Sequence, residues 1–132
     1  ILHVKLAHLD KWNEHRRCLA ESYGQELVTA GLTLPHVPNW AEPVWHLYVV
    51  RHPRRDALQK ALSGAGVGTL IHYPIPPHLQ EAYRATTCWT RGAFPLAERL
   101  ADEVLSLPMG PHLSEEQVET IVSSVIEADT CV

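Results

Sequence analysis

The sequence has no long hydrophobic run and no excess of basic residues, and each absence excludes a class of protein. Its apolar segments are all shorter than the roughly 20 residues that cross a bilayer, and its first residues do not have the layout of a signal peptide. Lysine and arginine total 11 against 15 aspartate and glutamate residues, which gives a net charge of −4 without a basic stripe. We therefore expect neither a membrane nor a nucleic acid as partner.

Cysteine is also scarce, and histidine does not cluster. The three cysteines, Cys18, Cys88 and Cys131, are far apart and form no CxxC pair, which argues against a disulfide framework or a structural zinc site and favours a reducing, cytoplasmic setting. The nine histidines are scattered and contain no His-x-x-x-His pair. Because a metal needs several ligands that converge on one point, we predict no metal site.

What is present is typical of one folded domain. The chain has 132 residues, 45% of them hydrophobic and 20% charged, enough for a single core. From Leu9 to Ala30 apolar residues recur at steps of three and four, which predicts a long amphipathic helix that ends at Gly31. A proline-rich connector follows it.

Three further segments have strand character. Residues 44–50 are β-branched or aromatic with apolar side chains on both faces, which predicts a central strand. Residues 69–73 and 104–107 are predicted to form two more strands. The first of these ends where the prolines begin, because proline cannot donate a hydrogen bond to a neighbouring strand. Helices are predicted between these strands, from Pro53 and over residues 96–103.

The last helix has the clearest start. Ser114 and Gln117 form a potential capping box, and the acids Glu115 and Glu116 complement the positive end of the helix dipole. Together the elements predict an α+β (α/β) fold, in which a long N-terminal helix leads into a small three-stranded sheet covered by helices.

Four segments resemble the DegT–DnrJ–StrS family of sugar aminotransferases, a branch of the fold-type I pyridoxal-phosphate enzymes. In chain order they are residues 1–17, 45–51 (WHLYVVR), 71–83 (IHYPIPPHLQEAY), and 94–98 (FPLAE) together with 105–109 (LSLPM). The resemblance implies a homodimer in which a large N-terminal domain carries pyridoxal 5'-phosphate and a smaller C-terminal domain closes the substrate cleft. It implies a nucleotide-linked ketosugar and an amino-acid donor as the partners of the full-length enzyme.

On this resemblance, residues 1–32 would be a connecting helix from a large domain outside this sequence, and residues 33–132 the small C-terminal α/β domain. The only lysines, Lys5, Lys11 and Lys60, lie in charged helical contexts that suit solvated side chains rather than a Schiff base. No glycine-rich phosphate loop precedes a helix. We therefore expect no catalytic residue in this chain, and no cofactor held by it alone.

Substrate contact is the role that these residues can supply. His72 and Tyr73 come at a strand end directly before a rigid proline turn, which favours substrate binding by two polar rings, although a structural role at the sheet edge is the alternative. His46 is predicted to be a hydrogen-bonded core histidine. His78 and Tyr83 are assigned to packing and dimer contacts, and the four tryptophans to core or interface.

Two other functions remain open on the sequence. The chain could be an independent, non-catalytic binding or dimerisation module descended from such an enzyme. Within the same family, it could also belong to a pyridoxal-phosphate-dependent sugar dehydratase in which histidine replaces the Schiff-base lysine. The residue at the Schiff-base position of the large domain would separate the dehydratase from the aminotransferase.

Overall fold

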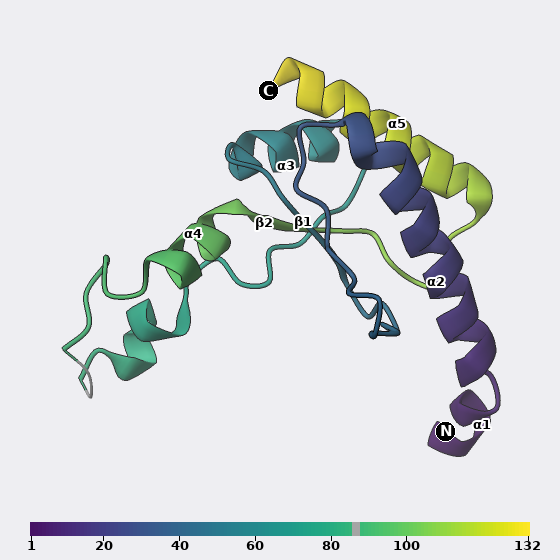
Figure 1. Cartoon of the computed structure of the whole chain (residues 1–132), viewed down its shortest axis with the longest axis horizontal. Coiled ribbons are helices and arrows are strands. Elements are labelled where there is room, and N and C mark those ends of the chain that lie inside the picture. Colours follow the sequence, from purple (N-terminus) through teal and green to yellow (C-terminus); the bar gives the residue numbers. More distant parts are fainter. Residues whose placement is uncertain (86–87) are drawn as a thin grey trace.

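The computed structural model describes residues 1–85 and 88–132, and Figure 1 shows helices gathered around a short sheet. The helices and strands, in chain order, are α1 (Leu2–Leu6), α2 (Leu9–Glu26), β1 (Tyr48–Arg51), α3 (Arg55–Gly64), α4 (Pro95–Glu103), β2 (Val104–Leu107) and α5 (Glu115–Cys131), with short 3₁₀ helices at Leu27–Thr29, Pro77–Leu79 and Glu81–Tyr83. Over the part of the chain that is described, no helix combines the length and apolarity of a membrane span. The mixed helix and sheet class predicted from the sequence is confirmed.

The sheet has two strands rather than the three predicted. β1 and β2 pair antiparallel, with Tyr48 opposite Leu107 and Arg51 opposite Val104. The predicted strand over residues 69–73 contributes only one isolated bridge, in which the Leu70 amide and carbonyl bond to Ser106 at 3.2 and 2.8 Å. The pairing stops there because the chain turns away into a segment whose prolines have no N–H to donate.

The first strand is also shorter than predicted, since it begins at Tyr48 and not at residue 44. Trp45 adopts a positive φ of 50°, a left-handed conformation that a strand cannot contain. The Arg16 guanidinium on α2 donates from Nη1 to the carbonyls of Trp45 and His46, at 3.1 and 3.3 Å. This clamp holds the bend that precedes β1.

The core lies between α2, α3, α5 and the sheet. The largest fully buried side chains come from all four and from the 3₁₀ helix after α2, namely Tyr23, Leu27, Tyr48, Val50, Leu58, Leu62, Leu105 and Val125. The capping box of the last helix is confirmed, because Ser114 Oγ accepts from the Gln117 amide and Gln117 returns the bond to the Ser114 amide.

The later part of the segment between the two strands projects away from this core. The part described as residues 74–85 and 88–103, here called the arm, contains two 3₁₀ helices and α4 and extends to the left of the body in Figure 1. α4 returns the chain directly into β2. The arm therefore joins the body beside the strand that carries Ser106.

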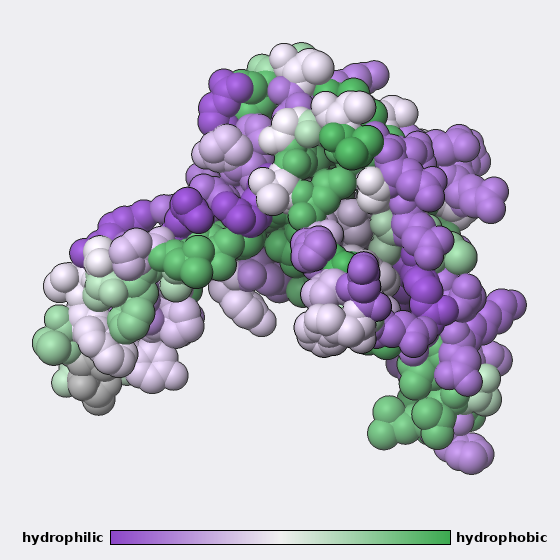
Figure 2. Space-filling view, viewed as in Figure 1, coloured by the Kyte–Doolittle hydropathy of each residue, from purple (hydrophilic) through white to green (hydrophobic). Residues whose placement is uncertain are grey.

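α1 forms a second projection, at the opposite side of the view. Ala7 and His8 separate it from α2, so the N-terminal helical stretch is interrupted rather than continuous. Its large apolar side chains are exposed, namely Ile1, Leu2, Val4 and Leu6. Figure 2 shows them as an apolar patch at the lower right of the molecule.

Candidate functional site

His72 and Tyr73 lie where the chain leaves the edge of the sheet. The bridge at Leu70 brings His72 beside β2, where its Nδ1 lies 2.9 Å from the Ser106 hydroxyl oxygen. Ser106 itself is buried, so it holds the half-buried imidazole in a fixed orientation. Tyr73 is 72% exposed, and its ring meets the histidine edge-on at 5.7 Å between centroids.

These two rings line a groove of about 310 Å³ at the base of the arm. One wall is formed by the proline turn that comes directly after Tyr73 in the chain, and the other is formed by α4. The remaining lining residues are Ile75, Pro76, Pro77, Gln80, Ala97, Leu100, Ala101 and Val104. The walls are apolar and carry few polar groups, a composition typical of small-ligand sites, and the volume is at the lower end of the range for such sites.

The arm is held together behind this groove by a buried hydrogen-bonded pair of side chains. His78 Nε2 lies 2.9 Å from Glu98 Oε1, and the side chains of both residues are almost fully buried. The same carboxylate accepts the Gly92 amide at 2.8 Å and the Phe94 amide at 3.2 Å. Mainly the Gly92 N–H, and then the Phe94 N–H and His78, hold the pKa of Glu98 below its ordinary value, although burial opposes the shift.

The structure places His78 in the packing role that the sequence predicts, but Glu98 was not singled out as a candidate. A signal for it exists: Glu98 lies three residues before the buried Ala101, on the face of α4 that faces the rest of the arm. An acid on an apolar helical stripe requires a partner. That partner, His78, is 20 residues away in the sequence and cannot be found from periodicity alone.

Arg55 is a buried cation at the junction of α3 and α4. Its guanidinium is buried and donates from Nη1 to the carbonyls of Ala101 and Val104, at 3.2 and 2.9 Å. A cation at this position satisfies the free carbonyls at the C-terminal end of α4. Arg55 thus fixes the groove-lining helix to the body.

His46 corrects another prediction. It is exposed rather than a core histidine, because the bend at Trp45 turns the chain out of the sheet before β1 begins. The four tryptophans differ in burial: Trp12 and Trp45 are half-buried, whereas Trp40 and Trp89 are exposed. Tyr83, assigned to packing or dimer contacts, is also exposed.

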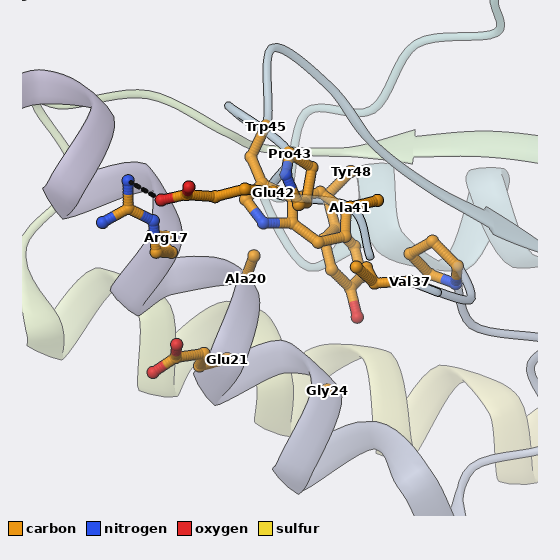
Figure 3. Close-up of a pocket in the computed structure, with 11 residues that line it drawn as sticks. Arg17, Ala20, Glu21, Gly24, Val37, Ala41, Glu42, Pro43, Trp45 and Tyr48 are labelled. Atoms are coloured by element: carbon orange, nitrogen blue, oxygen red, sulfur yellow. Dashed lines mark ion pairs between the residues drawn. The ribbon is translucent and has the colours of Figure 1, made fainter. Parts of the chain in front are cut away.

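A separate cavity of about 410 Å³ lies between α2 and the connector before β1, and Figure 3 shows the residues that line it. Arg17 pairs with Glu42 across its mouth at 3.3 Å and also with Glu14. Tyr48 forms part of its wall, and burial raises the pKa of this phenol. The cavity shares no lining residue with the groove, so the two are separate.

The residues described include no lysine suited to a Schiff base and no group of side chains suited to a metal ion. Lys5, Lys11 and Lys60 are all exposed, as the sequence predicts, and an exposed lysine lacks the desolvation that a Schiff-base lysine requires. The residues present therefore do not fit pyridoxal phosphate. Within residues 1–85 and 88–132 there is no group of three or more histidine, cysteine or acidic side chains that could hold a metal ion.

Comparison with known proteins identifies the family. The sequence matches the DegT/DnrJ/EryC1/StrS aminotransferase family over residues 1–126. The chain belongs to this family. The resemblance seen in the four sequence segments is thereby confirmed.

Individual family members are similar over nearly the whole chain. The erythromycin biosynthesis sensory transduction protein EryC1 of Saccharopolyspora erythraea is 52% identical over 126 residues, which are 95% of this chain and 34% of that protein. A dTDP-3-amino-3,4,6-trideoxy-alpha-D-glucose transaminase of Streptomyces venezuelae is 44% identical, over 96% of this chain and 34% of its own length. The crystal structure of S. venezuelae DesV superposes with a TM-score of 0.91 at 44% identity, covering 96% of this chain and 34% of DesV.

These alignments also set the extent of the match. The chain spans about a third of the length of the curated relatives, and it corresponds to their C-terminal part. The two-stranded sheet, the arm and the groove therefore belong to a chain that corresponds to the C-terminal part of its relatives.

Proposed function

We propose that this chain is the C-terminal domain of a pyridoxal-phosphate-dependent aminotransferase that acts on a nucleotide-linked ketosugar, and that it is not catalytic alone. The observation that carries the proposal is the groove in which His72 and Tyr73 are mounted side by side between the proline turn and α4. It is supported by a relative at 44% identity that is a transaminase of a dTDP-linked amino sugar.

Within this assignment, His72 and Tyr73 bind the substrate. Ser106 occupies Nδ1 of the imidazole, which leaves Nε2 as the nitrogen available to a ligand, since no residue described here bonds to it. The Tyr73 phenol can donate to or accept from a sugar hydroxyl or a phosphate oxygen. The apolar walls of the groove lie beside these two contacts, and the half-buried His72 is the better shielded of the two because Tyr73 is 72% exposed.

The cofactor is assigned to another part of the enzyme. Pyridoxal phosphate serves as the amino-group carrier in this family, and the exposed lysines of this chain do not suit its attachment. We therefore place the Schiff-base lysine and the phosphate cradle in the region of the relatives that these 132 residues do not cover. The amino-acid donor reacts there.

The architecture of the whole enzyme follows the same division. Residues 1–32, with α1 and α2, connect to the cofactor domain, and residues 33–132 form the small domain of a homodimer. The exposed apolar side chains of α1 support this, because a surface of this kind usually packs against another part of the protein. Three exposed free cysteines suit a reducing compartment, and we place the enzyme in the cytoplasm.

The proposal is tested by the affinity of the full-length protein for a nucleotide sugar. His72→Ala and Tyr73→Phe should each weaken binding of a dTDP- or UDP-linked hexose by roughly three- to thirty-fold, the effect of losing one hydrogen bond in a partly desolvated site. Isothermal titration calorimetry measures this, and cofactor content from absorbance serves as the control. Unchanged affinity in both variants, with the wild-type protein binding, would show that the two rings are structural.

A further inference from the structure

The groove is built from two segments that are not continuous in the chain. Pro76 and Pro77 form part of one wall, and His78 follows them directly. Ala97 and Ala101 form part of the other wall, and Glu98 lies between them on α4. The His78–Glu98 pair therefore joins the two walls through the residues adjacent to the lining ones.

The Glu98 carboxylate does more than bind one histidine. It accepts three different N–H groups, from His78, Gly92 and Phe94, and so connects the proline turn, the loop before α4 and α4 itself. Gly92 has a positive φ of 98°, which gives its N–H a direction that few other residues could adopt. The His78 ring also packs edge-on against Phe94 at 4.8 Å.

Neither side chain is available to contact a ligand. His78 and Glu98 are 8% and 7% exposed, and neither lines the groove. Both oxygens of the carboxylate already accept backbone amides. A buried pair of this kind can fix the geometry of a site without touching its substrate.

We propose that His78 and Glu98 are positioning residues for nucleotide-sugar binding, which set the separation of the proline turn from α4 and thereby the width of the groove. This inference rests on the proposed function, since the groove whose width the pair sets is the groove proposed to bind the sugar. It predicts that breaking the pair weakens sugar binding even though His72, Tyr73 and the lining side chains are all intact.

The test compares four single variants of the full-length protein by nucleotide-sugar affinity and thermal stability. Glu98→Gln removes the charge, His78→Leu removes the donor, and His78→Gln keeps an N–H donor in its place. Glu103→Gln is the matched control, because Glu103 is also on α4 and pairs with Arg51 at 2.6 Å, yet does not line the groove. We expect Glu98→Gln and His78→Leu to weaken binding by about ten-fold, because small displacements of positioned groups have large effects on a site.

His78→Gln should recover much of the affinity that His78→Leu loses, and Glu103→Gln should lower the melting temperature without a matching loss of affinity. If the loss of affinity is proportional to the loss of melting temperature, with the same proportion in all four variants, the pair contributes only to stability. That result would overturn the inference and leave the proposed function intact. If the wild-type protein fails to bind a nucleotide sugar, the proposed function and this inference are both wrong.

Discussion

Gly31 lies at a contact between the connector and the C-terminal helix. Its amide donates to Asp129 Oδ2 at 2.8 Å, while Asp129 Oδ1 lies 3.4 Å from Nε2 of the buried His52. His52 Nδ1 accepts the Arg54 amide at 3.1 Å, so Nε2 carries the proton that faces Asp129. One carboxylate thus ties the end of α5 to both the connector and the residue after β1.

The prediction concerns Gly31→Ala. A Cβ there would lie 2.9 Å from Asp129 Oδ1, so the carboxylate must move and its bonds to Gly31 and His52 weaken. We expect a loss of about 1 kcal/mol in the free energy of unfolding, the usual net contribution of one hydrogen bond, because the Gly31–Asp129 bond is exposed. Gly64→Ala is the control, since nothing lies within 4 Å of its Cβ and alanine favours the helix. Urea denaturation of both variants measures the difference, and equal stability would contradict the account.

A second prediction at the residue scale is a pH dependence of stability due to Glu98. Because the folded state lowers its pKa from the ordinary 4.5, the ionised carboxylate stabilises the fold above that value. This contribution is lost as the pH falls through the lower pKa of the folded state. The stability difference between the parent and Glu98→Gln should therefore be largest near neutral pH and shrink below pH 4.5.

The comparison is best made in a His78→Gln background, where the Glu98 carboxylate faces an uncharged amide instead of an imidazole. Urea midpoints of the two proteins, measured at several pH values, give the difference directly. A difference that stays constant from neutral to acid pH would mean that the charge of Glu98 does not contribute to stability.

Single residues also mark the limit of sequence-based prediction. The exposure of the three lysines could be predicted because a lysine is almost never fully buried without a partner. The burial of Arg55 and Glu98 could not, since their partners are 46 and 20 residues away and only tertiary structure brings them together. His46 was assigned to the core because its segment is apolar throughout, whereas the clamp from Arg16 bends the chain before it.

At the scale of elements, the helices were predicted more accurately than the sheet. The bounds of α4 and β2 and the start of α5 lie within a residue of those predicted, because caps, prolines and apolar periodicity are local signals. Strand pairing is not local. Residues 69–73 have the composition of a strand, but whether they pair depends on β2 and on the prolines that turn the chain away.

The capping box of α5 gives a prediction at this scale. Ser114→Ala removes the side-chain acceptor of the Gln117 amide and should lower the free energy of unfolding by about 1 kcal/mol. Ser123→Ala on the same helix is the control, because that exposed hydroxyl bonds only to the Glu119 carbonyl within the helix. Alanine there should leave stability unchanged or slightly raised. Thermal melts would contradict this account if both variants behaved alike.

At the scale of the whole molecule, the structure consists of a packed body with two projections of different character. The arm carries a groove that is internally braced by the His78–Glu98 pair, and it is fixed to the body through Arg55. α1 carries exposed apolar side chains and no such bracing. This arrangement suits a domain that presents a substrate-binding surface with its arm and attaches to the rest of the enzyme through its first helices.

The central claim is a division of labour, in which this domain contacts the sugar and the cofactor is held elsewhere. The most direct measurement follows the two half-reactions of the full-length enzyme separately by stopped-flow absorbance, in the parent and in His72→Ala and Tyr73→Phe. We predict that the half-reaction with the ketosugar slows by several-fold to about a hundred-fold at limiting substrate, the range for one lost hydrogen bond to a neutral or charged partner, while the half-reaction with the amino donor changes little. Equal slowing of both half-reactions, or no slowing of either, would contradict the account.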